Sequence, residues 1–286
     1  MNEKKPRIVY FEILRVIAIF GVLFCHTGAS GIHHYLETSN GFNYWFGIFA
    51  VSVSQYCVPL FFMITGALLL NRQESIRYVL RHRVLKMAIV TFLAVLMQYL
   101  WNHRAEPHMG FDRKLYFRIV YEGGAATPQW FLYTYLSFLL ILPFLQRMVK
   151  SIPEKSWFIY LFISWEVING VFPILAYYQE WGETPLELPM FGNAVICSAL
   201  GYFVECCTGD VFYQGKNVFR AFIVVNLLAV ETMYMNHISL PYREYADYCG
   251  LFAPAFAFLI YIAVRYVCYH WKFPQVLEKV FRFAGQ

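Results

Sequence analysis

Residues Ile8–Thr27 read IVYFEILRVIAIFGVLFCHT, and this stretch decides the fold. About 20 predominantly apolar residues are enough to cross a bilayer as a helix, so we expect a membrane span here. A plain hydrophobic anchor has no need of ionisable side chains, yet Glu12, Arg15 and His26 lie inside the stretch. Ionisable groups within a membrane are costly and usually face a protein interior or a watery cavity. The stretch therefore predicts a helix with one functional face.

The spacing of these polar residues supports a common face. Arg15 and His26 are close to three helical turns apart, which separates them by about 16 Å along the axis. Glu12 precedes Arg15 by three residues, and this spacing allows an ion pair. Simpler interpretations stay open at this point: Arg15 could be an anchor that extends to the cytoplasmic interface, and His26 a capping or packing residue.

Composition places the chain among helical membrane proteins. Of its 286 residues, 59% are hydrophobic and only 14% are charged, whereas a soluble domain carries about a quarter of charged residues. No cysteine–histidine spacing typical of a zinc site occurs, so no metal is predicted. We predict an all-α, polytopic transmembrane bundle with about eight spans, the second of them kinked at Pro59. The spans cover residues 8–28, 44–70, 84–101, 129–149, 156–177, 189–206, 217–236 and 247–270.

The charges of the predicted connections indicate the orientation. With the N-terminus inside, seventeen Lys and Arg residues fall on the inner side and five on the outer side. Such a bias marks the cytoplasmic side of a membrane protein. We therefore expect a multi-pass protein of the plasma or inner membrane with a cytoplasmic N-terminus. Membrane lipid is an expected partner, nucleic acid is not, and a homo-oligomer stays open.

A basic cluster marks the entry to the third predicted span. Arg77, Arg81, His82, Arg83 and Lys86 fall within ten residues. One interpretation is anchoring at the inner membrane surface, with anionic lipid headgroups as partners. The other is a phosphate site, because arginine forks grip phosphate oxygens in pairs and lysine adds a point charge. A polyanion such as a nucleotide-bearing thioester would suit the cluster, with Arg15 approaching from the first span.

Two further stretches carry weaker signals. Thr65, Gly66 and Ala67 are small and permit close helix packing. The stretch Pro128–Tyr135 fits the outer end of a helix, where Trp130 and neighbouring tyrosines belong to the interfacial aromatic belt.

In combination these residues resemble the acyltransferase-3 family of multi-spanning membrane acyltransferases. The matching positions occur in the right order from the first to the sixth predicted span. They are Arg15 and His26 with ten residues between them, Phe61-Phe62 to Gly66, Arg81 to Lys86, Trp130-Phe131-Leu132 with Pro143 beyond, and Phe191 to Gly201-Tyr202-Phe203.

The resemblance implies an enzyme that moves an acyl group, commonly acetyl, from cytoplasmic acyl-CoA (acetyl-CoA) to an acceptor. The acceptor is a hydroxyl, sometimes an amine, of a sugar, glycan, peptidoglycan or lipid-linked precursor. His26 then corresponds to the catalytic base of the family and Arg15 to its CoA-contacting arginine. We place Glu12 with His26 in the catalytic set, Arg81, Arg83 and Lys86 with Arg15 at acyl-CoA, and Trp130 and Tyr133 at the acceptor.

The chain also departs from the family. Lys86 stands where many members have a second arginine, no Glu follows Trp130-Phe131-Leu132, and eight predicted spans fall short of the usual ten. The segment Phe273–Gln286 looks like a short amphipathic cytoplasmic helix, and its end, Phe281–Gln286, resembles the lead-in to a final span. We therefore treat residues 1–286 as a single membrane acyltransferase domain and expect further spans after it.

The main alternative is a membrane transporter or a lipid-linked glycan flippase without acyl transfer. Glu166, Asn169, Glu205, Asn226 and Glu231 lie within predicted spans and could line a pathway. Inverted repeats would support a transporter, and none is evident in the sequence.

Overall fold

Every regular element in the described part of the chain is a helix. The computed structural model describes residues 9–37, 41–104, 111–122, 129–152, 154–171, 175, 190–239 and 252–271. The predicted all-α fold is confirmed for these residues, among which no strand occurs. The helices are α1 (Val9–Glu37), α2 (Gly41–Ser54), α3 (Cys57–Leu69), α4 (Ile76–Val79), α5 (Leu85–Asn102), α6 (Arg113–Glu122), α7 (Trp130–Ser151), α8 (Lys155–Glu166), α10 (Met190–Cys206), α11 (Gly215–Ser239) and α12 (Phe252–His270).

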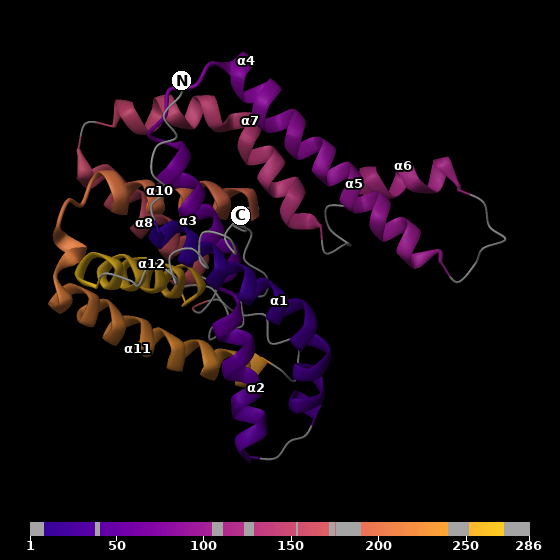
Figure 1. The fold of residues 1–286 in the computed structure, drawn as a ribbon. Helices are drawn as coiled ribbons and strands as arrows, with labels where there is room; N and C mark the ends of the chain where they lie inside the picture. Colours follow the sequence, from indigo (N-terminus) through magenta and orange to yellow (C-terminus); the bar gives the residue numbers. More distant parts are fainter. Residues whose placement is uncertain are drawn as a thin grey trace.

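Helix α3 lies at the centre of the bundle, with α1, α7, α10 and α12 around it (Figure 1). It crosses α10 in direct backbone contact. A methyl group on Gly66 would lie 1.8 Å from the carbonyl oxygen of Ser198, and one on Gly201 would lie 1.9 Å from that of Met63. Only glycine permits such an approach, as is common where membrane helices cross. The predicted packing role of the small residues in α3 is therefore confirmed for Gly66.

The second predicted span consists of two helices. Gln55 and Tyr56 separate α2 from α3. Pro59 has no N–H for the carbonyl of Gln55, and its ring clashes with a carbonyl four residues earlier in a continuous helix. The expected kink at Pro59 is therefore corrected to a break just before α3. Tyr56 holds this break against α1, because its hydroxyl donates a 2.8 Å hydrogen bond to the carbonyl oxygen of Ile17.

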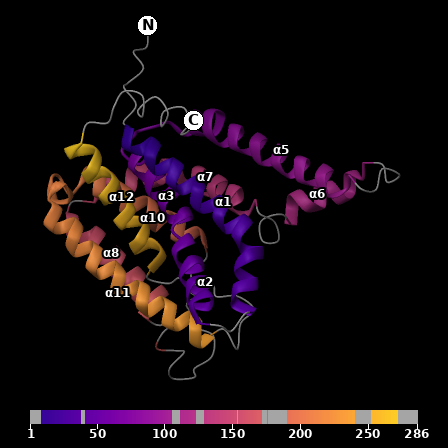
Figure 2. The same cartoon turned by 60° about the horizontal axis from the view of Figure 1, so that its bottom comes forward.

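Helices α5 and α6 form an arm to one side of the bundle, visible in both cartoon views (Figures 1 and 2). Tyr116 of α6 is buried against Val95 and Tyr99 of α5, and its hydroxyl donates to the carbonyl oxygen of Phe92 at 3.0 Å. The rest of α5 carries large exposed hydrophobic side chains, of which Met97 is 72% exposed. A helix that is apolar on nearly all sides fits a lipid environment.

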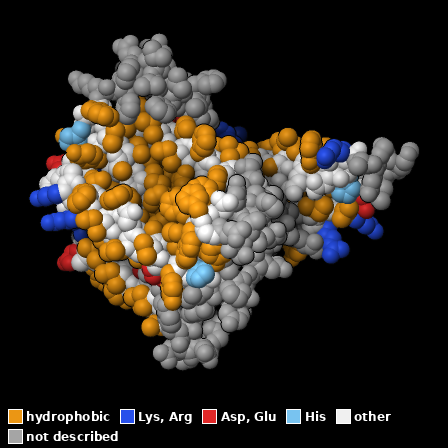
Figure 3. Space-filling model, turned by 90° about the horizontal axis from the view of Figure 1, so that it is seen from below, with side chains coloured by type: hydrophobic (Ala, Val, Ile, Leu, Met, Phe, Trp, Pro, Cys, Tyr) orange, Lys and Arg blue, Asp and Glu red, His pale blue; other side chains and the backbone are white. Residues whose placement is uncertain are grey.

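Six helical segments in the described residues are long and apolar enough to cross a membrane. They are Val9–His26, Gly41–Leu69, Ile76–Asn102, Trp130–Ser151, Gly215–His237 and Phe252–His270, and they correspond to six of the eight predicted spans. On the face in Figure 3, hydrophobic side chains predominate and the Lys and Arg side chains in view lie toward its edges. The chain is a multi-pass membrane protein.

The other two predicted spans are shorter helices. The prediction 189–206 corresponds to α10, which has 17 residues and packs inside the bundle against α3. The prediction 156–177 corresponds to α8, which ends after 12 residues and continues into a π-helical turn, Val167–Val171. At about 1.5 Å per residue, α10 extends about 25 Å and α8 about 18 Å. The predicted helix Phe273–Gln286 lies outside the described residues.

Candidate functional site

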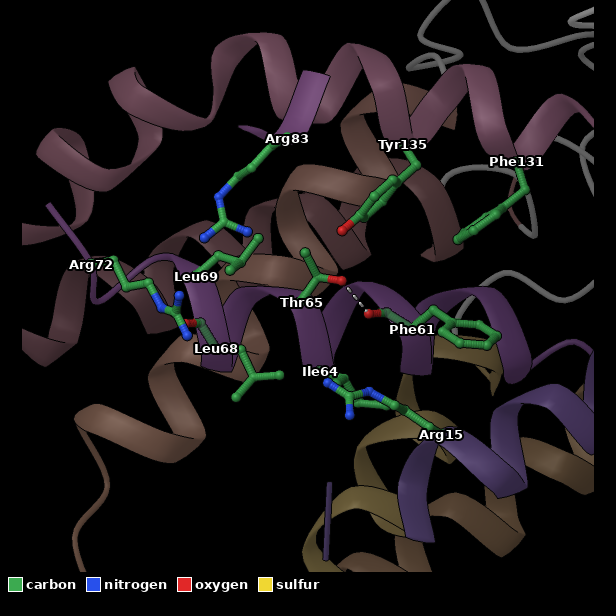
Figure 4. A pocket seen from close by; sticks show the side chains of 10 residues that line it. All are labelled: Arg15, Phe61, Ile64, Thr65, Leu68, Leu69, Arg72, Arg83, Phe131 and Tyr135. Atoms are coloured by element: carbon green, nitrogen blue, oxygen red, sulfur yellow. Dashed lines mark hydrogen bonds between the residues drawn. The ribbon is translucent and has the colours of Figure 1, made fainter. Parts of the chain in front are cut away.

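A cavity of about 390 Å³ lies between α1, α3, α7 and the segment that leads into α5 (Figure 4). Three arginines approach it from three different parts of the chain, and two aromatic side chains of α7 border it. The lining residues are Arg15, Phe61, Ile64, Thr65, Leu68, Leu69, Arg72, Arg83, Phe131 and Tyr135. Such a mixture suits an anion attached to a flat or apolar group. Among the described residues, no group of three or more His, Cys, Asp or Glu side chains is arranged to hold a metal ion.

Arg15 reaches the cavity from α1 and is held there by Glu12. Its Nη1 donates hydrogen bonds of 2.8 Å to both carboxylate oxygens of Glu12. The Glu12 side chain is 3% exposed and that of Arg15 is 32% exposed. A buried carboxylate needs a charged partner, so Glu12 keeps Arg15 paired. The two hydrogen bonds hold the guanidinium of Arg15 in one orientation. The ion pair expected from the spacing is confirmed.

Arg83 reaches the cavity from the opposite side and is held by Glu74. Its Nε and Nη2 donate to the two carboxylate oxygens of Glu74 at 2.6 and 2.5 Å. Nη1 of Arg72 lies 3.7 Å from the same carboxylate. Burial raises the pKa of Glu74, but the hydrogen bond and charge of Arg83, followed by the charge of Arg72, bring it below its ordinary value. Glu74 therefore carries its negative charge at neutral pH.

Arg83 lies in a π-helical turn together with Arg81 and His82. The turn covers Leu80–Val84, between α4 and α5. One such turn adds a residue to the helix and shifts the direction of the side chains around it, and π turns are frequent at functional sites. Arg83 is 19% exposed and lines the cavity, whereas Arg81 and Lys86 are exposed and do not line it. The structure thus brings Arg83, but not Arg81 or Lys86, together with Arg15.

The aromatic side of the cavity comes from α7. Phe131 and Tyr135 are one turn apart, with stacked ring centroids 6.0 Å from each other. Figure 4 shows the hydroxyl of Tyr135 directed toward Thr65. The two residues predicted to bind the acceptor do not line this cavity. Tyr133 faces α6 and donates a 2.8 Å hydrogen bond to the carbonyl oxygen of Val120, and Trp130 packs edge-on against Phe131.

His26 lies further along α1 than Arg15 and has an exposed side chain. Helix α1 is unbroken from Val9 to Glu37, so Arg15 and His26 do share one face, about 16 Å apart along the axis. His26 is not among the residues that line the cavity of Arg15. Its role as a base therefore stays a prediction, with the common face as its geometric support.

Arg72, Tyr135 and Gln146 belong to this site or support it, but they were not predicted from the sequence. The Gln146 side chain of α7 is 1% exposed. Its Nε2 donates to the carbonyl oxygen of Leu69 at 2.9 Å, and its Oε1 accepts the backbone N–H of Glu74 at 3.1 Å. A lone amide in an apolar span was a usable signal, because polar side chains in a membrane need partners.

Comparison with known protein families identifies the family of this chain. The family model described as an acyltransferase domain matches residues 8–286, nearly the whole sequence. The chain belongs to the acyltransferase-3 family. No curated protein and no solved structure gives a significant match. The family match confirms the resemblance drawn from the residues and makes this acyltransferase-3 protein a membrane acyltransferase.

Proposed function

We propose that this protein transfers an acyl group, acetyl in the first instance, from cytoplasmic acyl-CoA to a hydroxyl of a cell-surface glycan, peptidoglycan or lipid-linked precursor. The main support for acyl-CoA as the donor is that Arg15, Arg72 and Arg83 converge on one cavity with an aromatic wall. Acyl-CoA combines phosphate groups with a flat adenine ring. Arginine forks bind phosphate oxygens, and aromatic rings stack on bases.

The cavity is suited to a part of the donor. Its volume of about 390 Å³ is at the lower end of small-molecule pockets, which run from about 300 to 1,000 Å³. We assign the phosphate end of the donor to the guanidinium groups. The thin pantetheine arm would then run along the face of α1 from Arg15 toward His26, a distance of about 16 Å.

In this proposal His26 is the general base, and imidazole is the usual base near neutral pH. The acceptor hydroxyl oxygen attacks the thioester carbonyl carbon while an imidazole nitrogen takes the hydroxyl proton. The C–S bond then breaks, and the departing thiolate receives the proton from the imidazolium. The products are an acyl ester of the acceptor and free CoA thiol. Glu12 contributes through Arg15, whose guanidinium it orients.

The orientation proposed for this reaction puts the N-terminus in the cytoplasm and the protein in the plasma or inner membrane. Its support is the distribution of seventeen basic residues on the inner connections against five on the outer ones. Arg15 would then face the cytoplasmic donor, and His26 would lie deeper, toward the acceptor.

The test is acceptor-dependent release of CoA thiol. The purified protein in lipid vesicles receives acetyl-CoA and, as acceptor probe, a soluble peptidoglycan fragment or a lipid extract from bacterial membranes. We expect thiol release with transfer of labelled acetyl, and a fall in kcat of about 10²–10⁴-fold for His26→Gln. His237→Gln is the matched control, because His237 lies on α11 and contacts Tyr44. Movement of the lipid probe across the bilayer without thiol release would favour a flippase instead.

A further inference from the structure

The connection between α3 and α4 forms one side of the arginine cavity and is fixed along its length. At its start, the backbone N–H of Leu70 donates to the carbonyl oxygen of Gly66 at 3.0 Å. At its end, Ser75 caps α4 by accepting the N–H of Tyr78 at 3.2 Å. Between these two points lie Arg72 and Glu74. The segment therefore presents one cation and one anion in a defined arrangement.

Gln146 of α7 anchors the middle of this connection. The side-chain amide donates to the last residue of α3, Leu69, and accepts from the backbone of Glu74. The carbonyl oxygen of Leu69 also accepts the backbone N–H of Arg72 at 3.1 Å, so Gln146 adds a second donor at the end of α3, where carbonyl groups have no intrahelical partner. The amide is almost fully buried, so the anchor is shielded from competition by water. It sets the place of Glu74 relative to α7.

Glu74 in turn fixes Arg83 directly and attracts Arg72, whose Nε donates to the carbonyl oxygen of Leu68 at 2.9 Å. Glu74 receives two hydrogen bonds from Arg83 and lies within 3.7 Å of Arg72. With Nε–H and one N–H of Nη2 engaged, Arg83 keeps both N–H groups of Nη1 and the second N–H of Nη2 for a ligand. Long side chains lose much rotamer freedom on binding, and a guanidinium that is already oriented loses less.

We propose that Glu74, anchored by Gln146, is a positioning residue that holds Arg83 and Arg72 ready for a phosphate ester or anhydride in the cavity. This inference rests on the proposed function, because the phosphate-bearing ligand is the acyl-CoA of that proposal. Glu74 touches neither the ligand nor the reacting atoms; it acts through the two guanidinium groups. If Glu74 instead competed with the ligand for Arg83, removal of its charge would strengthen ligand binding.

The decisive comparison uses Glu74→Gln, which keeps the side-chain shape and removes the charge, and Glu74→Asp, which keeps the charge on a shorter arm. Glu154→Gln is the matched control, because Glu154 is exposed and its carboxylate accepts a hydrogen bond from the neighbouring Ser156, away from the cavity. Two assays are used: thiol release gives KM and kcat for acetyl-CoA, and calorimetry gives the Kd of adenosine 3′,5′-bisphosphate. The second is a binding readout that needs no turnover.

We expect Glu74→Gln to raise KM and the Kd of the bisphosphate about tenfold, with kcat within about twofold, as for the loss of one oriented charge-assisted contact. Glu74→Asp should fall between this variant and the wild type, and Glu154→Gln should match the wild type. An unchanged or lowered Kd for Glu74→Gln overturns the proposal, and a lowered Kd identifies Glu74 as a competitor.

The design separates this inference from the proposed function. Thiol release by the wild type together with wild-type constants for Glu74→Gln overturns the positioning role and leaves acyl transfer standing. Bisphosphate binding without any thiol release overturns acyl transfer, and the Kd comparison still decides the role of Glu74. A wild type that neither binds the bisphosphate nor releases thiol overturns both. If Glu74→Gln is not monodisperse in detergent, Glu74→Asp decides, and a Kd equal to the wild type overturns the role.

Discussion

The guanidinium of Arg265 in α12 lies 3.5 Å from the carboxylate of Glu205 in α10 and is 5% exposed. The same carboxylate accepts hydrogen bonds from the hydroxyl groups of Tyr10, at 2.7 Å, and Tyr261, at 3.2 Å. A polar cluster thus joins α1, α10 and α12 inside the bundle. Glu205 is one of the residues that the transporter alternative would place in a pathway. Its partners instead indicate a role in holding three helices together.

Arg265→Met is expected to destabilise the protein by on the order of 3 kcal/mol, because it leaves the Glu205 carboxylate without its cation. The measurement is the unfolding midpoint in detergent. Adding Glu205→Gln to Arg265→Met should recover part of the loss. Arg220→Met, at an exposed position on α11, is the control and should change little. An Arg265→Met protein as stable as the wild type would contradict a structural role for the cluster.

Gly66→Ala is expected to abolish folding or greatly lower the yield of monodisperse protein. The added methyl would lie 1.8 Å from a backbone oxygen of α10, so α3 and α10 would have to separate. The comparison is Gly209→Ala, whose φ of +55° makes alanine unfavourable but whose surroundings are open. That change should cost only about 1–2 kcal/mol. Equal behaviour of the two variants in size-exclusion chromatography would argue against the close crossing.

Replacing the basic residues one at a time distinguishes the contribution of a cation in the cavity from that of cations on the surface. Arg83→Ala is expected to raise KM for acetyl-CoA about tenfold or more, since it removes an oriented cation from the cavity. Arg81→Ala and Lys86→Ala should each change KM less than about twofold, as expected for exposed charges. Steady-state thiol release measures all three. Equal effects of the three substitutions on KM would instead indicate that the whole basic cluster between Arg77 and Lys86 binds the phosphate groups.

The contribution of the Glu74–Arg83 pair to the stability of the fold should decrease as the pH falls. Because the pKa of Glu74 is lowered in the folded state, its contribution is present above the unfolded value of about 4.3 and is lost as the pH falls through the folded value. The groups that face it, Arg83 and Arg72, stay charged throughout. The stability difference between wild type and Glu74→Gln should therefore be constant from about pH 8 to 5 and vanish in stronger acid. A difference that grows on acidification would be inconsistent with this pairing.

Part of the candidate site was predictable because it depends on local geometry. The Glu12–Arg15 pair follows from a three-residue spacing on one helix, and its bond lengths bear this out. The packing role of Gly66 also follows from its small size in an apolar span. The position of Arg83 was predictable only as one of several cations. Arg81, Arg83 and Lys86 were predicted alike from the sequence, whereas in the structure Arg83 alone among these three lines the cavity.

The sequence by itself determined that this chain is a helical membrane protein of the acyltransferase-3 family, because hydropathy, charge bias and motif spacing are local properties of the chain. It also determined that Arg15 and His26 share a face of α1. Only the tertiary structure decided that Arg72 and Arg83 join Arg15 at one cavity and that Gln146 anchors Glu74 between them. These contacts join segments up to 77 positions apart, and a side chain's direction there depends on helix phase and packing that no local pattern specifies.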